Sequence, residues 1–147
     1  MKRQKTYISV DIEAALIRGK QYIIEIGAVK WKPDGTKETF TQFVQPYRFT
    51  KLNNRIQSLT GITTEQLLDA PSFKYAINQF KHWCKDDYIL LTFGEFDRKV
   101  LEEELARNYI KPNFIYPMID FQQKYMIHHK VKEQPSLGGL MAELGLE

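Results

Sequence analysis

The most informative stretch of this chain is Tyr7-Ile8-Ser9-Val10-Asp11-Ile12-Glu13-Ala14. Its β-branched residues favour a strand, in which successive side chains point to opposite faces. One face then carries Ile8, Val10 and Ile12. The other face carries Asp11 and Glu13, so the pattern predicts two carboxylates side by side in an otherwise apolar strand.

Two neighbouring carboxylates in an apolar strand repel each other and lose hydration unless a cation lies between them. Mg²⁺ and Mn²⁺ prefer oxygen ligands, and phosphate-cleaving sites commonly hold them with a few carboxylates. Asp11 and Glu13 are therefore candidate ligands of a divalent metal. The alternative is that these two acids only end a strand at a solvated edge.

The composition is that of one ordinary globular domain. The chain has 147 residues, of which 43% are hydrophobic and 13% aromatic, so we expect a single domain over residues 1–147 with a buried core. Lys and Arg outnumber Asp and Glu by 21 to 18. The resulting charge of +3 is compatible with a polyanionic partner but does not require one.

Cysteine usage and hydropathy predict a cytoplasmic protein. The only cysteine, Cys84, excludes an intramolecular disulfide and falls in a helical pattern typical of a buried structural thiol. The basic residues at 2–5 are followed by an apolar run that Asp11 and Glu13 interrupt, which argues against a signal peptide. No stretch approaches the ~20 apolar residues that span a bilayer.

Two more strands are predicted directly after the first. Residues 22–31 are strongly β-prone and follow a polar connection over 16–21, and a turn at Pro33-Asp34-Gly35 precedes a third strand over 36–44. Glu25 is an acid inside the second strand. It either hydrogen-bonds across the sheet or faces solvent at an edge, and we favour the edge.

Helices alternate with one further strand in the rest of the chain. Thr63 and Gln66 have the spacing of a capping box, and an apolar stripe at helical spacing predicts a helix that begins after Ser72. The stripe consists of Phe73, Ile77, Phe80 and Cys84. The apolar run over 88–93 predicts a strand covered on both faces.

Three more helices complete the predicted order. One begins after Gly94 with Asp97 in its first turn, where the helix dipole alone would favour an acid. The others are predicted over 119–129 and 136–145. This order describes an antiparallel meander with a further strand returned through helices, that is, an α/β sheet flanked by helices.

Several of these stretches together resemble one enzyme family, the DEDD exonucleases. Val10–Ala14 resembles the first exonuclease motif, and Tyr22–Val29 resembles the strand that follows it. Leu59–Thr63 and then Ala70–Phe73 are similar to the segment that leads into the next helix. Thr92–Asp97 resembles the second exonuclease motif. Each match is weak alone, but their order and spacing are specific and cover essentially the full chain.

The resemblance implies a fold, an activity and a cofactor. The implied fold is RNase H-like, a five-stranded mixed sheet whose first three strands are antiparallel. The closest branch is that of the Eri-type 3'-5' exoribonucleases, including KapD-like proteins, which is of the DEDDh type. In that family four acids hold two divalent ions, Mg²⁺ or Mn²⁺, and a histidine is the general base. The implied substrate is a single-stranded 3' end, RNA in this branch, from which nucleoside monophosphates are released.

The family's metal ligands carry over to three positions of this chain. By resemblance, Asp11 bridges both ions, Glu13 binds one and Asp97 serves the other. Two cations ~3.5 to 4 Å apart stabilise the negative charge that phosphodiester hydrolysis places on the attacking and leaving oxygens.

Contacts with the substrate carry over in the same way. The backbone around Glu13 and Ala14 is implied to meet the terminal sugar, while Ile62 and Phe96 offer apolar surface to the last bases. Taken alone, Ile62 and Phe96 are more simply explained by core packing. Ala15 departs from the small polar residue that many relatives have after the acid pair, which affects the details of 3'-terminal recognition.

The third motif of the family, a histidine followed by the fourth acid, has no match. It normally follows the helix that here ends at 144–146, and the sequence stops at Glu147. His128 and His129 precede that helix, so neither is assigned as general base. We therefore expect a C-terminally incomplete exonuclease domain that lacks the last helix of the fold and has little or no activity. The missing helix is expected to leave an apolar groove, with binding of a partner, self-association or poor solubility as the result.

A different class of function fits the same residues. A non-catalytic nucleic-acid-binding or regulatory module with an exonuclease-like fold would retain the sheet and lose the chemistry. Such a module does not need metal at Asp11, Glu13 and Asp97, so the affinity for Mg²⁺ or Mn²⁺ distinguishes the two hypotheses.

Overall fold

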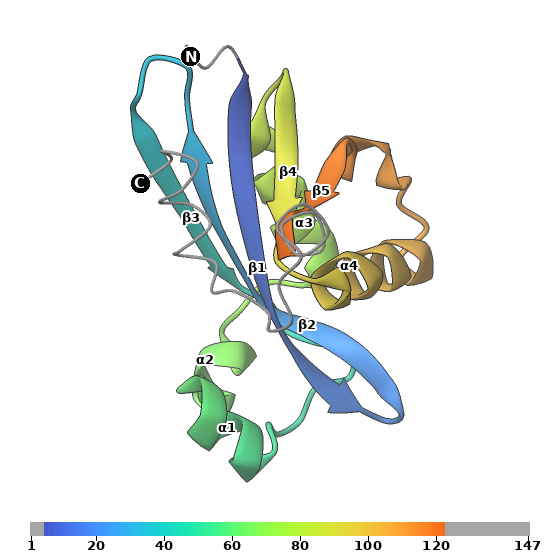
Figure 1. The fold of residues 1–147 in the computed structure, drawn as a ribbon. Coiled ribbons are helices and arrows are strands. Elements are labelled where there is room, and N and C mark those ends of the chain that lie inside the picture. The colour runs from blue at the N-terminus through green and yellow to red at the C-terminus, as the bar shows by residue number, and fades with distance from the viewer. Residues whose placement is uncertain (1–4, 123–147) are drawn as a thin grey trace.

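The computed structural model describes residues 5–122, and in this part of the chain it shows a five-stranded sheet in the order β3-β2-β1-β4-β5 (Figure 1). The strands are β1 (Thr6–Ile17), β2 (Lys20–Trp31), β3 (Lys37–Phe43), β4 (Tyr88–Thr92) and β5 (Met118–Asp120). The α-helices are α1 (Asn54–Thr60), α2 (Thr64–Leu68), α3 (Phe73–Cys84) and α4 (Glu95–Arg107), and a 3₁₀ helix covers Pro112–Ile115.

The sheet is mixed. β1, β2 and β3 form an antiparallel meander, whereas β4 pairs in parallel with β1, and β5 pairs in parallel with β4. This confirms the predicted α/β sheet, including the antiparallel arrangement of its first three strands.

The turn between β1 and β2 is tighter than predicted. In place of a polar connection over 16–21, the two strands stay paired as far as Ile17 and Lys20. Arg18 and Gly19 make the turn with φ values of 50° and 79°. Positive φ at both central residues is the geometry of a two-residue hairpin whose twist matches that of the strands.

A β-bulge interrupts the pairing of β1 with β2. Glu13 faces Glu25, but Ala14 faces Ile23, so Ile24 is the extra residue. Ile23 and Ile24 are both fully buried, and they belong to different core clusters. Such a bulge increases the local twist of the strand, and it shifts the register so that Ile23 rather than Ile24 faces Ala14.

Helices α3 and α4 cover one face of the sheet, and α1 and α2 lie at its lower end (Figure 1). The main core joins the apolar side chains of α3 and α4 to Ile8, Val10 and Ile12, as the alternation of the first strand predicts. Cys84 is buried in this core, which raises the pKa of its thiol to about 12 and confirms the structural role predicted for it.

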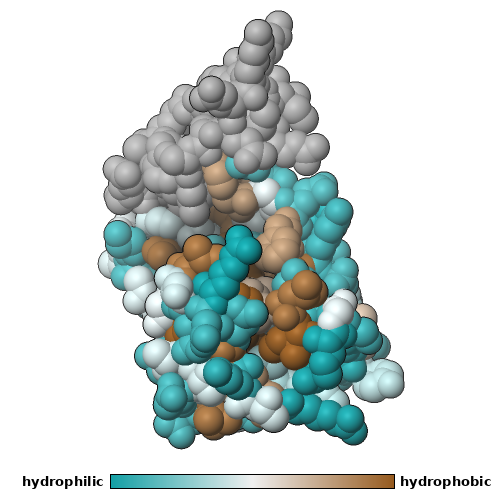
Figure 2. Space-filling model, turned by 90° about the horizontal axis from the view of Figure 1, so that it is seen from below, coloured by the Kyte–Doolittle hydropathy of each residue, from teal (hydrophilic) through white to brown (hydrophobic). Residues whose placement is uncertain are grey.

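The predicted start signals of α2 and α3 are confirmed. Thr63 and Gln66 form a complete capping box before α2, and the Ser72 side chain accepts a hydrogen bond from the Tyr75 amide at the start of α3. Seen from below, hydrophobic residues gather near the middle of the face, with hydrophilic residues around them (Figure 2).

The predicted helix over 119–129 is wrong at its start. Residues 118–120 form β5, which pairs with β4 from Leu90↔Met118 to Thr92↔Asp120. A three-residue strand is too short to show periodicity, and its existence depends on the neighbouring strand. The predicted helix over 136–145, the groove expected beside it, and His128 and His129 lie outside the described residues. Within residues 5–122, no helix combines the length and apolar character that a membrane span needs.

Candidate active site

The candidate site lies where β1 and β4 separate. These two strands pair only from Thr6↔Tyr88 to Ser9↔Leu91. Three residues further along β1, the Ile12 amide donates a hydrogen bond to Oδ2 of Asp97 instead, at 3.3 Å. Asp97 is 85 residues away in sequence. The contact therefore brings the α4 carboxylate to the part of β1 that carries Asp11 and Glu13.

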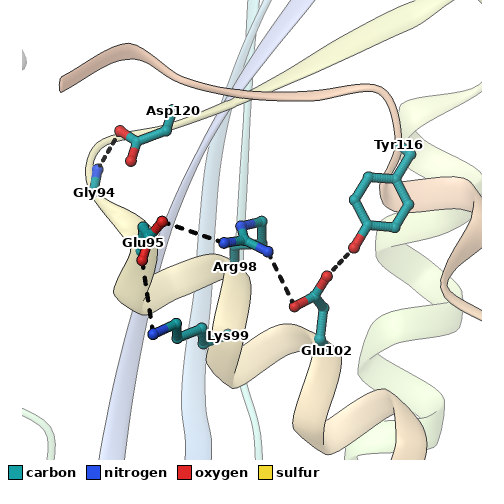
Figure 3. Close-up of polar contacts among 7 residues, drawn as sticks. All are labelled: Gly94, Glu95, Arg98, Lys99, Glu102, Tyr116 and Asp120. Atoms are coloured by element: carbon teal, nitrogen blue, oxygen red, sulfur yellow. Dashed lines mark hydrogen bonds and ion pairs between the residues drawn. The ribbon is translucent and has the colours of Figure 1, made fainter. Parts of the chain in front are cut away.

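The start of α4 is held in place from the neighbouring strand. The Gly94 amide, directly before the helix, donates to Oδ1 of Asp120 at 2.9 Å, and Figure 3 shows these two groups facing each other. Gly94 has φ of 100°, a value that favours glycine. β5 thus fixes where α4 begins, and Asp97 is in the first turn of that helix.

Ion pairs along α4 join its cations to acids of the same helix (Figure 3). Arg98 pairs with Glu95 at 3.5 Å and with Glu102 at 3.4 Å, while Lys99 pairs with Glu95 at 3.7 Å. Glu102 also accepts a hydrogen bond from the Tyr116 hydroxyl. The cations nearest to Asp97 in sequence are therefore engaged by acids of their own helix.

The site is electrostatically unfavourable as a set of bare carboxylates. Burial raises the pKa of Asp97 to about 6; Asp11 and Glu13 also raise this pKa, and the hydrogen bond from Ile12 opposes the rise. The pKa of Glu13 is raised by burial and then by Asp11. The negative charge of Asp11 therefore acts on both Glu13 and Asp97, which places the three predicted ligands in one acidic region.

Glu25 is a further acid of the site that sequence reasoning placed wrongly. It does not face solvent at an edge, because β2 is an interior strand of the sheet and Glu25 is half-buried opposite Glu13. Its pKa is raised by burial, then by Glu13 and Asp11. The missing signal was the register between β1 and β2, which turns an isolated acid into a neighbour of the predicted pair.

The donor chemistry fits a hard divalent cation. Among residues 5–122, none of Asp11, Glu13, Glu25 and Asp97 forms an ion pair with a lysine or arginine. Neighbouring carboxylates that repel one another gain from a shared cation, and carboxylate oxygens are the ligands that Mg²⁺ and Mn²⁺ prefer. As the side chains stand, no group of three acid, histidine or cysteine side chains in the described part of the chain is arranged to hold an ion. Metal binding therefore requires these carboxylates to close in on a common centre.

The predicted substrate contacts fall in different environments. Ala14 is half-buried beside the main core. The surface role expected for Ile62 is not what the structure shows, because its side chain is 3% exposed and packs with Ala15 and Ile24. For Phe96, the simpler prediction of core packing is wrong, because its side chain is 52% exposed on α4 next to Asp97.

Comparison with known proteins places the chain in a family. The RNase_T exonuclease family model matches residues 8–147. The chain is 34% identical to the PolC-type DNA polymerase III of Bacillus subtilis over 128 residues, which are 78% of the chain and 9% of the polymerase. It is 33% identical to the probable 3'-5' exonuclease KapD of Bacillus subtilis over 104 residues, which are 70% of the chain and 51% of KapD. The chain thus spans about half of one relative and a small part of the other.

Among solved structures, the nuclease domain of 3'hExo, a DEDDh family member bound to rAMP, superimposes with a TM-score of 0.77 at 28% identity. The match covers 87% of this chain and 72% of that one. It agrees with the mixed sheet described above and with the family model, which spans nearly the whole sequence. The chain therefore belongs to the exonuclease family, and within it to the DEDDh type.

Proposed function

We propose that this domain is a two-metal 3'-5' exonuclease that removes nucleoside monophosphates from the 3' end of RNA. The observation that supports this most strongly is the hydrogen bond from the Ile12 amide to Asp97, which joins the two exonuclease motifs. The name of KapD as a probable 3'-5' exonuclease and the rAMP bound to 3'hExo support the same activity.

In this proposal Asp11, Glu13 and Asp97 hold the Mg²⁺ or Mn²⁺ ions. When bound, the two ions stabilise negative charge on the attacking and leaving oxygens of the phosphodiester. The Ile12 amide holds the Asp97 carboxylate beside β1. The backbone at Glu13 and Ala14 positions the terminal sugar, and the exposed Phe96 ring offers a stacking surface for the last base.

The relatives differ in the nucleic acid that their names specify. A 3'-exonuclease that recognises the histone mRNA stem-loop matches with a TM-score of 0.77 and 28% identity. The DNA polymerase relatives point to DNA instead. The resemblance to the Eri-type and KapD-like branch favours RNA, and the single free cysteine, Cys84, supports a cytoplasmic location.

We expect these 147 residues to hydrolyse RNA slowly. The sequence has no histidine after His129, so no His-x4-Asp pair follows the predicted helix over 136–145. General acid-base catalysis is typically worth ~10² to 10⁴ in rate. Added imidazole, which supplies a base in solution, is therefore expected to increase the rate.

The test is a 5'-labelled oligoribonucleotide with a free 3' hydroxyl, incubated with Mn²⁺ and imidazole. The proposal predicts a ladder that shortens from the 3' end, with loss of the ladder in Asp11→Asn. A DNA strand of the same sequence measures the sugar preference. Internal cleavage, or equal rates for wild type and Asp11→Asn, would contradict the proposal.

One observation favours the non-catalytic module as a second candidate: no three metal-binding side chains among residues 5–122 are arranged to hold an ion. The two candidates differ in metal affinity. An exonuclease domain binds Mn²⁺ through Asp11, Glu13 and Asp97, whereas for a pure binding module the Asn and Gln variants of these residues change nothing.

A further inference from the structure

A cavity of about 530 Å³ lies at the opposite end of α4 from Asp97. Lys20 and Tyr22 from the β1–β2 hairpin, Tyr47 from the segment after β3, and Arg107 and Tyr109 from the end of α4 help to line it. Glu104, the lining residue on α4 nearest to Asp97 in sequence, lies seven positions after it, which corresponds to about 10 Å along the helix axis. The cavity is thus a second feature of the same helix and separate from the candidate active site.

Exposed tyrosine rings stand at this cavity. Tyr47 is 66% exposed and Tyr109 is 94% exposed. Tyr109 also has φ of 57°, a left-handed conformation that is unusual for a tyrosine. Packing does not account for these rings, because most of their surface faces solvent. A π-face open to solvent is the surface on which an unpaired base stacks, whatever the sequence.

Positive charge surrounds these rings. Among the described residues, four cationic side chains lie in or beside the cavity: Arg18, Lys20, Arg48 and Arg107. The Arg18 guanidinium donates to the carbonyls of Tyr47 and, at 3.3 Å, Arg48. The guanidinium of Arg48 lies 5.2 Å from the centre of the Tyr47 ring. Cations interleaved with aromatic rings are typical of surfaces that follow a nucleic-acid backbone.

The acid among the lining residues, Glu104, offsets the charge of Arg107 but forms no ion pair with Arg18, Lys20 or Arg48. Glu104 is 3% exposed; it accepts a hydrogen bond from the Ile23 amide at 2.7 Å and lies 3.7 Å from Arg107. The start of α3, at Ser72 and Phe73, also lines the cavity and has no acid in its first turn. Its partial positive charge adds to the attraction for an anion.

We propose that this cavity is an exosite for single-stranded nucleic acid, with unpaired bases stacked on Tyr47 and Tyr109. Lys20, Arg18 and Arg48 then contact the phosphates of the same segment. The choice of nucleic acid over an acidic peptide rests on the proposed function. The exosite binds a segment of the strand that is distant from the cleaved 3' end. Binding there therefore does not require metal or hydrolysis.

The test is the binding of a fluorescein-labelled oligouridylate of about ten nucleotides, followed by anisotropy in EDTA. Base stacking on an aromatic side chain is worth enough that the double variant Tyr47→Ala/Tyr109→Ala should raise Kd at least about 5-fold. Tyr75→Ala is the matched control, because Tyr75 is 56% exposed on α3 and does not line this cavity. The control should change Kd less than about 2-fold.

A second probe separates stacking from charge. An abasic strand of the same length keeps its phosphates, so it should bind more weakly and should not respond to the double variant. Wild-type affinity in the double variant overturns the exosite. Equal binding of the abasic strand, or displacement of the oligouridylate by polyglutamate at equal charge, overturns the nucleic-acid assignment. Tyrosine-dependent binding without any cleavage in Mn²⁺ and imidazole contradicts the proposed function and leaves the exosite supported.

Discussion

Among single residues, Asp97 is a proposed metal ligand whose charge destabilises the metal-free protein. Burial raises the pKa of its carboxyl group to about 6, and the charges of Asp11 and Glu13 add to this rise. We predict that Asp97→Asn stabilises the metal-free protein at pH 8 by on the order of 1 kcal/mol, after discounting for its partial exposure. The asparagine amide oxygen still accepts from Ile12 but carries no charge. Urea unfolding in EDTA measures this, and an unchanged or lower midpoint would argue against mutual repulsion.

Glu104 provides a hydrogen-bond acceptor for the backbone next to the bulge at Ile24. The Ile23 amide donates to the buried Glu104 carboxylate at 2.7 Å. Glu104→Ala leaves this amide without that acceptor and should cost about 1–3 kcal/mol of unfolding free energy at pH 7. Glu104→Gln keeps an acceptor of similar shape and should cost clearly less. Equal losses in the two variants would show that packing, and not the hydrogen bond, matters at this position.

The raised pKa of Glu104 predicts that the stability of the fold depends on pH. Burial raises the pKa of Glu104 from its usual 4.5 to about 7, so the folded state binds this proton more tightly than the unfolded state does. The stabilisation that comes from this tighter proton binding is fully present below about pH 4.5 and is lost as the pH rises to about 7. The difference in unfolding free energy between wild type and Glu104→Gln should therefore fall by up to about 3 kcal/mol between pH 4.5 and pH 8. A difference independent of pH would contradict this assignment.

Among the elements, the start of α4 depends on the backbone of Gly94. Its φ of 100° is strained for any other residue, and an added Cβ would meet the Gln122 side chain at 3.3 Å. Gly94→Ala should destabilise the fold by about 1–3 kcal/mol and displace Asp97. Gly27→Ala is the control, because its Cβ would make only an ordinary contact at 3.5 Å. Thermal unfolding of the two variants compares them directly, and equal melting temperatures would refute the argument.

The elements also show what the sequence alone can predict. Alternation in Ile8, Val10 and Ile12 and the helical stripe of α3 are local patterns, and both were confirmed. The bulge at Ile24 and the three-residue β5 were missed, because each exists only through pairing with another strand. The neighbourhood of Glu25 was missed for the same reason. Local periodicity reveals faces, whereas register requires the partner strand.

For the whole molecule, the fold places Asp97 of α4 beside the middle of β1, the part of the strand that carries Asp11 and Glu13. Asp11, Glu13 and Asp97 were predicted as a set from motif resemblance, and the contact of Asp97 with the Ile12 amide explains how they meet. Nothing in the periodicity of the chain could predict that contact, since it spans 85 residues. The fold must therefore form before the site exists, and a ligand of the site should in turn stabilise the fold.

The central claim is that these three acids together bind divalent metal, and calorimetric titration of Mn²⁺ into the metal-free protein tests it most directly. We predict binding to the wild type that weakens at least about 100-fold in Asp11→Asn and in Asp97→Asn. A melting temperature that rises with Mn²⁺ in the wild type alone should accompany it. Glu95→Gln, which removes an acid that pairs with Arg98 and Lys99, should bind like the wild type. Equal Mn²⁺ affinity in the wild type and both aspartate variants would contradict the account.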